Sequence, residues 1–134
     1  MLLFFRRLFK GPPVKEPSVP LGPSAVLRLQ DCIVERIASE LPQVWASYKL
    51  HYEHSVWQGE TFEKYVSVCH AADGKVDYSP SLEVLDLLLE LQKAAAGGGE
   101  AWTHLTCEFD RSGKYKFEFL YGMPPLTAKA VGFA

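Results

Sequence analysis

The sequence has few cysteines, no long apolar run and almost no net charge. Its 134 residues include three cysteines, Cys32, Cys69 and Cys107, an odd number at wide spacing with no Cys-x-x-Cys motif. A secreted disulfide framework would pair its cysteines and a zinc site would cluster them, so a reducing, cytoplasmic compartment is expected instead. No run approaches the ~18 apolar residues that cross a bilayer, which argues against an integral membrane protein.

The net charge of −2 hides an uneven distribution. Residues 1–23 carry four basic side chains against one acid, a net +3, whereas residues 53–110 carry three lysines against eleven acids, a net −8. Such an acidic stretch repels a phosphate backbone, so direct binding to nucleic acid is not expected and a basic protein is the better partner. The alternative is that these acids are ordinary solvated side chains.

Residues 1–23 are expected to form a basic N-terminal arm and a proline-rich linker, followed by a single domain over residues 24–134. The apolar residues precede Arg6 and Arg7, the reverse of the order in a secretory signal. Residues 11–23 hold five prolines and two glycines, which is typical of an extended linker. Local packing or partial disorder of the arm is preferred to an interfacial helix, and no stable membrane insertion is expected.

Two helices are predicted from apolar residues that recur three and four positions apart. The first spans residues 24–41, with Ser24 as its N-cap and Pro42 as its stop. The second opens at Ser79-Pro80, where Ser79 would accept the free amides, and continues through a leucine-rich segment. Its polar residues form one narrow exposed stripe, namely Glu83, Asp86, Glu90 and Lys93.

Alternation of apolar and polar residues predicts the strands. Residues 45–53 and 62–70 form one antiparallel pair, residues 75–78 a possible short strand, and residues 103–109 and 115–121 a final hairpin. Strands joined by short turns pair antiparallel. The predicted fold class is therefore α+β, with a single antiparallel sheet of four to five strands and the two main helices packed on one face.

No residue pattern supports an enzyme, a metal site or a cofactor. His51 and His54 are three apart in a strand and face opposite sides, and the same holds for His104 and Cys107. The glycine run 97–99 lacks the Lys-Ser/Thr that follows a phosphate-binding loop. An uncharacterised enzyme stays an alternative because active sites assemble from residues far apart in sequence, and a deep pocket with perturbed titratable groups would indicate one.

Residues 100–121 carry a resemblance to a known family. The segment Glu100-Ala101-Trp102-Thr103-His104-Leu105-Thr106 leads into a strand, and the turn Ser112-Gly113-Lys114-Tyr115 leads into an aromatic strand. This order resembles the YezG-type immunity proteins. Two further segments also fit this family: Tyr78-Ser79-Pro80-Ser81, which precedes a leucine-rich helix, and Leu41-Pro42, which is followed by Trp45. The resemblance therefore spans roughly residues 25–121.

The resemblance implies a bacterial antitoxin that binds the C-terminal toxic domain of a secreted polymorphic toxin, delivered by contact-dependent growth inhibition or a related system. That domain is often a nuclease, whose basic cleft an acidic protein can occupy in a 1:1 complex. Candidate toxin-binding residues lie around the first hairpin and along the second helix: Glu53, Trp57, Glu60, Glu63, Glu83, Asp86 and Glu90.

Other interpretations stay open at this point. Each candidate acid could equally be a solvated surface residue, and Trp45 and Trp102 are expected to pack in the core or at its rim. A secretion chaperone or adaptor would bind an effector without neutralising it, and a toxicity assay separates that function from immunity.

Overall fold

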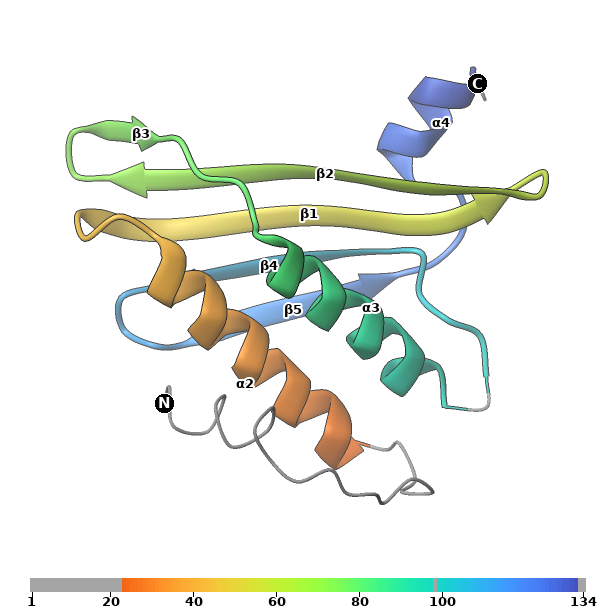
Figure 1. Ribbon diagram of the computed structural model, residues 1–134, viewed down its shortest axis with the longest axis horizontal. Coiled ribbons are helices and arrows are strands. Elements are labelled where there is room, and N and C mark those ends of the chain that lie inside the picture. Colours follow the sequence, from red (N-terminus) through yellow and green to blue (C-terminus); the bar gives the residue numbers. More distant parts are fainter. Residues whose placement is uncertain (1–22, 98, 133–134) are drawn as a thin grey trace. The chain divides into compact units, whose positions relative to one another are not determined.

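The computed structural model describes residues 23–97 and 99–132, which form three helices and five strands (Figure 1). All strand pairs are antiparallel, and the sheet has the order β3-β2-β1-β4-β5. The predicted α+β class with a single antiparallel sheet is therefore confirmed. Along the chain the elements are α2 (Pro23–Glu40), β1 (Trp45–Trp57), β2 (Glu60–Ala71), β3 (Gly74–Val76), α3 (Leu82–Ala96), β4 (His104–Asp110), β5 (Tyr115–Leu120) and α4 (Pro125–Val131).

The described residues fall into two compact units. A helical unit holds residues 23–41 and 80–101, and a sheet unit holds residues 42–79 and 102–132. Apart from Pro23, where α2 begins, the predicted N-terminal arm lies outside the described residues. Within the described part, no helix combines the length and apolar character needed to span a bilayer.

The helical unit is built from α2 and α3, whose apolar residues are buried at helical spacing. Ile33 and Ile37 of α2 are fully buried, as are Val84, Leu88 and Leu91 of α3. The two helices contact each other along their lengths. The periodicity of the sequence therefore predicted both helices correctly, because apolar residues three and four apart share one face.

The helix caps differ from those predicted. Helix α2 already includes Ser24, so this residue is not its N-cap. Helix α3 starts two residues later than Ser79-Pro80 suggested, and its N-cap is Ser81, whose Oγ accepts a hydrogen bond from Val84 N (3.3 Å). The Ser81 hydroxyl also donates to Glu40 Oε2 (2.6 Å), which ties the start of α3 to the end of α2. This second contact depends on tertiary structure, so spacing alone could not distinguish between the two serines.

The long hairpin of β1 and β2 dominates the sheet unit. Its turn contains Gln58 (φ 52°) and Gly59 (φ 79°), and two successive positive φ values are what a tight hairpin turn of the right twist needs. Strand β1 runs to Trp57, four residues beyond the predicted strand, because its pairing with β2 continues to the turn. The two sides of the sheet follow the predicted alternation, so that Tyr48, Leu50 and Tyr52 are buried on one side.

Trp102 is the largest fully buried side chain of the sheet unit. It is 1% exposed, stacks on Phe119 (ring centroids 5.9 Å apart, interplanar angle 8°) and meets Tyr52 edge-on at 6.2 Å. Trp45 is also buried and contacts Phe109 edge-on. Both tryptophans are core residues, as expected, and Trp102 fixes the aromatic side of β5 on the sheet.

The turn between β4 and β5 is held to the start of β1 by Arg111. Its Nε donates to the carbonyl of Trp45 (2.7 Å), a second guanidinium nitrogen donates to the carbonyl of Gln43, and the guanidinium lies 4.8 Å from the centre of the Trp45 ring. Within the turn, Asp110 accepts a hydrogen bond from Ser112 N (2.8 Å), and hydrogen bonds from Ser112 lower the pKa of this aspartate. The polar turn therefore has a structural function.

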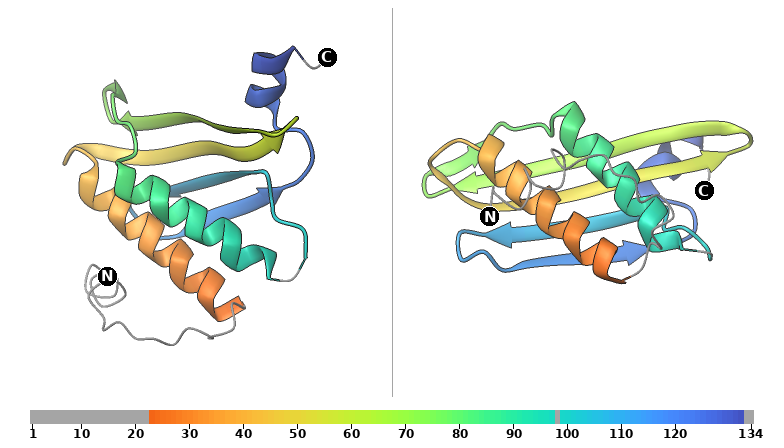
Figure 2. Two further views of the ribbon diagram at one scale, coloured as in Figure 1. Left: turned by 45° about the vertical axis from the view of Figure 1, so that its right-hand side comes forward. Right: turned by 60° about the horizontal axis from the view of Figure 1, so that its bottom comes forward.

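Helix α4 was not predicted. It starts with Pro125 at its first position, ends at Gly132 in the left-handed conformation (φ 74°) and lies against β2 (Figure 2). Proline at the start and glycine just past the end are a recognised helix signal. The signal was present in residues 125–132, but seven residues are too few for a convincing apolar period.

Candidate functional site

Glu53 is buried under α4, so its predicted contact with a toxin is wrong. The side chain is 0% exposed. Its Oε1 accepts hydrogen bonds from Thr127 N (2.8 Å) and Thr127 Oγ1 (2.7 Å), and its Oε2 accepts from Leu126 N (2.7 Å) and His51 Nε2 (2.7 Å). The carboxylate therefore satisfies the free amides at the start of α4, which is where negative charge is most favourable on a helix.

The pKa of Glu53 reflects these contacts. Burial by itself would raise it, but the hydrogen bonds from His51, Thr127 and Leu126 outweigh burial and hold the pKa below the usual glutamate value. The ring of His104 lies 5.9 Å from that of His51, and burial together with the nearby His51 lowers the pKa of His104. Three of the four hydrogen bonds to Glu53 come from Leu126 and Thr127, so the carboxylate anchors α4.

The remaining hairpin candidates do not form one patch. Trp57 and Glu60 face each other in the β1–β2 register beside the turn, with Trp57 half-buried and Glu60 exposed. Glu63 is three residues from Glu60 and therefore lies on the other side of the strand. There its Oε2 accepts a hydrogen bond from the hydroxyl of the buried Tyr52 (2.5 Å). The structure thus separates the hairpin candidates onto two faces.

The acidic stripe on α3 is exposed, as predicted. Glu83, Asp86 and Glu90 are all exposed on this helix. Glu83 forms an ion pair with Arg36 of α2. Partial burial and the negative charge of Asp86, one turn earlier, raise the pKa of Glu90, while Lys93 partly offsets the effect. Asp86 and Glu90 therefore repel each other in the unbound protein.

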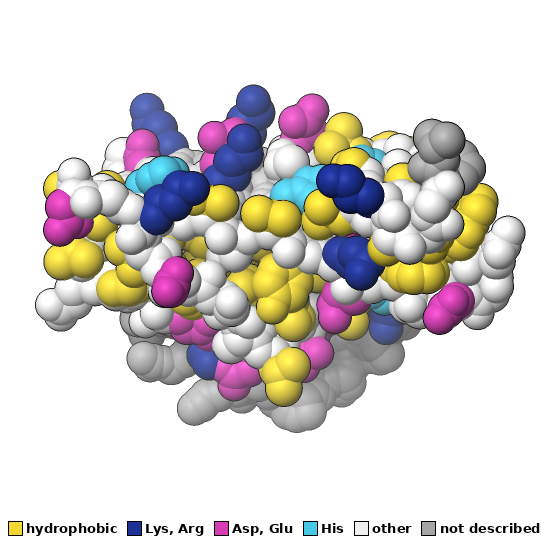
Figure 3. Space-filling view, turned by 90° about the horizontal axis from the view of Figure 1, so that it is seen from above, with side chains coloured by type: hydrophobic (Ala, Val, Ile, Leu, Met, Phe, Trp, Pro, Cys, Tyr) yellow, Lys and Arg dark blue, Asp and Glu magenta, His cyan; other side chains and the backbone are white. Residues whose placement is uncertain are grey.

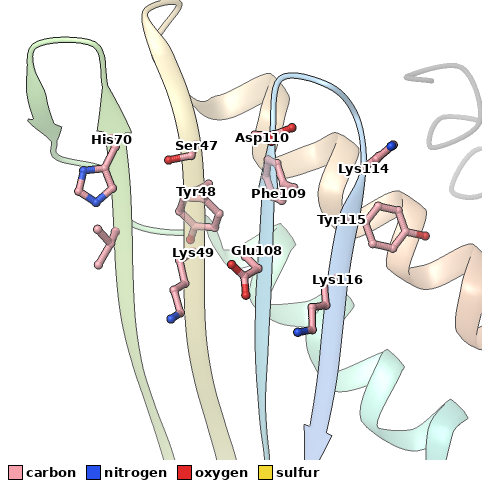
Figure 4. A pocket seen from close by; sticks show the side chains of 11 residues that line it. Ser47, Tyr48, Lys49, His70, Glu108, Phe109, Asp110, Lys114, Tyr115 and Lys116 are labelled. Atoms are coloured by element: carbon pink, nitrogen blue, oxygen red, sulfur yellow. The ribbon is translucent and has the colours of Figure 1, made fainter.

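A groove on the polar side of the sheet was not found by sequence reasoning. It has a volume of about 620 Å³, is open to solvent and is crossed by a row of charges: Lys49, Glu108 and Lys116 are direct neighbours on β1, β4 and β5 (Figure 4). His70 and Asp110 lie beside the row. Acidic and basic side chains are also interspersed rather than segregated in the view of Figure 3. Alternation identified these positions as polar, but only the register between β1 and β4 brings them together.

The three cysteines are free and buried, as expected of structural thiols. Burial, with a smaller contribution from the charge of Glu35, raises the pKa of Cys32 to about 12, and burial also raises the pKa of Cys69 and of Cys107. Thiols with raised pKa values are poor nucleophiles because the thiolate is the reactive form. Among the described residues, no three His, Cys, Asp or Glu side chains are grouped as metal ligands.

The motif that carries the family resemblance has structural contacts throughout. Trp102 is a core residue, Thr103 Oγ1 donates to the carbonyl of Gly122 (2.7 Å), and Gly113 adopts a positive φ of 91° in the β4–β5 turn. No protein-family model matches the chain, and no curated protein matches it.

Proposed function

We propose that this chain is an immunity protein that binds the C-terminal domain of a cognate secreted toxin in a 1:1 complex and neutralises it by covering its active surface. The resemblance of residues 100–121 to YezG-type immunity proteins supports this family of functions. The proposed toxin is a nuclease, because its basic phosphate-binding cleft complements an acidic protein. The proposed place of action is the cytoplasm, where the nucleic acid to be protected lies.

The observation that carries the proposal is the mutual repulsion of Asp86 and Glu90 on the exposed stripe of α3. Two carboxylates one helical turn apart destabilise the free protein, and this repulsion adds to partial burial in raising the pKa of Glu90. A lysine or arginine of a partner placed against them would relieve this repulsion and add a charge-assisted contact. The stripe Glu83, Asp86 and Glu90 is therefore the proposed toxin-binding surface. Trp57, Glu60 and Glu63 stay a separate proposed contact.

Co-expression tests neutralisation directly. The toxin domain encoded beside this chain is expressed in a bacterial host with and without the full chain, and viable counts are compared. We expect survival only when both are present. Survival of cells that carry the toxin alone, or death despite a purified complex between the two proteins, would contradict the proposal. The second result would indicate a secretion chaperone, which binds without neutralising.

Charge reversal on α3 tests the surface. The triple variant Glu83→Lys, Asp86→Lys and Glu90→Lys is expected to slow association with the toxin by roughly 10- to 100-fold at low salt, because exposed charges act mainly on the rate of encounter. The melting temperature should fall only slightly, because the three side chains are exposed and the Glu83–Arg36 ion pair that is lost lies at the surface, where such a pair contributes about 1 kcal/mol or less. Association is measured by stopped-flow fluorescence at two salt concentrations.

The matched control changes the same charge elsewhere. The variant Asp73→Lys, Asp77→Lys and Glu100→Lys alters three other exposed acids by an equal amount. If the α3 surface binds the toxin, the control should lose much less association rate than the α3 variant. Equal losses in both would show a general effect of net charge and would move the interface away from α3.

A further inference from the structure

Strand β5 is an end strand of the sheet, and half of its backbone groups point away from the sheet. In the described part of the chain, β5 pairs only with β4. The carbonyl of Leu120 accepts a hydrogen bond from Thr103 N on the β4 side (2.9 Å). Backbone groups alternate sides along a strand, so the even-numbered residues of β5 direct theirs toward β4, and Phe117 and Phe119 direct theirs outward.

The side chains of β5 form a pattern that is complementary to itself. The sequence Lys116-Phe117-Glu118 places a basic residue and an acidic residue on either side of Phe117. Lys116 and Glu118 are both exposed on the polar side of the sheet, and Phe117 is half-buried on the apolar side. In an antiparallel pair of two such strands centred on Phe117, each Lys116 faces a Glu118.

We propose that β5 pairs with β5 of a second copy of this chain, antiparallel and about a two-fold axis at Phe117, so that two five-stranded sheets join into one. The two Phe117 residues would exchange backbone hydrogen bonds with each other, because their outward groups lie at the axis. This is a self-complementary interface of the kind that two-fold symmetric dimers use. It uses none of the residues proposed above for toxin binding.

The charges of the sheet select this register. An antiparallel pair centred on Lys116 would place two lysines opposite each other, and one centred on Glu118 would place two glutamates opposite each other, which is unfavourable in both cases. Centring on Phe117 instead extends a row that already exists. Lys49, Glu108 and Lys116 alternate in sign across β1, β4 and β5, and Glu118 of the second copy continues the alternation across the axis.

The size of the contact sets its strength. One six-residue strand buries less surface than the interfaces of stable complexes, so the dimer is weak and depends on concentration. We expect sedimentation velocity of the full chain, from low micromolar to near-millimolar concentration, to show a shift from the 15.0 kDa monomer toward twice that mass. Added salt should weaken the shift, since the charge pairs at the axis are exposed.

Charge-swapped variants test the register. Lys116→Glu alone gives four acids around the axis, and Glu118→Lys alone gives four lysines, so each variant should self-associate about tenfold more weakly than the wild type. Mixing the two variants should restore association, because an acidic β5 then faces a basic β5. The double variant Lys116→Glu with Glu118→Lys should also dimerise again, since it keeps both charge pairs across the axis with their signs exchanged.

These outcomes decide the proposal. Recovery in the mixture and in the double variant supports pairing at β5 in the stated register, because folding defects in single variants are not repaired by mixing. A wild-type chain that stays monomeric at every concentration overturns it. So does a dimer that the single variants leave unchanged. If the wild type stays monomeric and Lys116→Glu no longer binds the toxin, a strand of the toxin occupies β5 instead.

Discussion

Replacing Glu53 with alanine is expected to lower the free energy of unfolding by about 3 kcal/mol and to release α4 from the sheet. The substitution removes the acceptor for Leu126 N, Thr127 N and Thr127 Oγ1 at once. Unpaired buried donors are costly, so the helix is expected to detach and find water. Once detached, a helix of seven residues is too short to persist. Urea unfolding measures the loss of stability, and amide hydrogen exchange of residues 125–131 measures the release.

The variant Glu53→Gln is the matched control. It keeps the shape and one acceptor oxygen but places an amide N–H₂ against donors, so an intermediate loss is expected. Contacts in the folded state lower the pKa of Glu53. Ionisation of Glu53 therefore stabilises the fold at pH values above its unfolded-state pKa, and this contribution disappears as the pH falls through the lower folded-state pKa.

The stability difference between wild type and Glu53→Gln should consequently be full near pH 7 and shrink as the solution is acidified. A difference that stays constant with pH would contradict the assignment of Glu53 as an ionised anchor. Undiminished protection of the amides of α4 in Glu53→Ala would contradict the anchoring itself.

Glu53 also shows what the sequence could and could not predict. Its position in the alternation of β1 was predicted correctly: it lies on the polar side with Lys49 and His51. Alternation assigns a side of the sheet, however, and does not reveal what covers that side. The cover is α4, more than seventy residues further along, and its short sequence has no usable period. A polar residue of a half-buried strand therefore became a buried anchor.

The groove and the β5 edge depend on strand order in the same way. The hairpins β1–β2 and β4–β5 follow from local turns such as Asp110-Arg111-Ser112-Gly113, and both were predicted. The pairing of β1 with β4 joins residues far apart in the chain, for example Lys49 with Glu108. This pairing leaves β5 at the end of the sheet and creates the charged row. Local propensity does not encode the pairing of β1 with β4, because this pairing depends on how the two hairpins pack together.

Truncating Trp102 to alanine is expected to cost about 4 kcal/mol of unfolding free energy, the largest loss among the substitutions considered. The side chain is 1% exposed, and its removal leaves a cavity between Tyr52 on β1 and Phe119 on β5. Phe119 loses the ring on which it stacks, so β5 should lose protection from hydrogen exchange before β1 and β2 do. Urea unfolding and exchange at residues 115–120 measure both effects.

Trp102→Phe separates loss of volume from loss of the aromatic contact. Phenylalanine keeps a ring between Tyr52 and Phe119 and leaves a smaller cavity, so a loss of roughly 1 to 2 kcal/mol is expected. Because the outward edge of β5 forms the proposed dimer, Trp102→Ala should also weaken self-association, while Trp102→Phe should largely preserve it. If Trp102→Ala keeps wild-type stability, this ring is not part of the core. If the variant loses protection of β5 from hydrogen exchange but still dimerises as the wild type does, the dimer contact lies elsewhere.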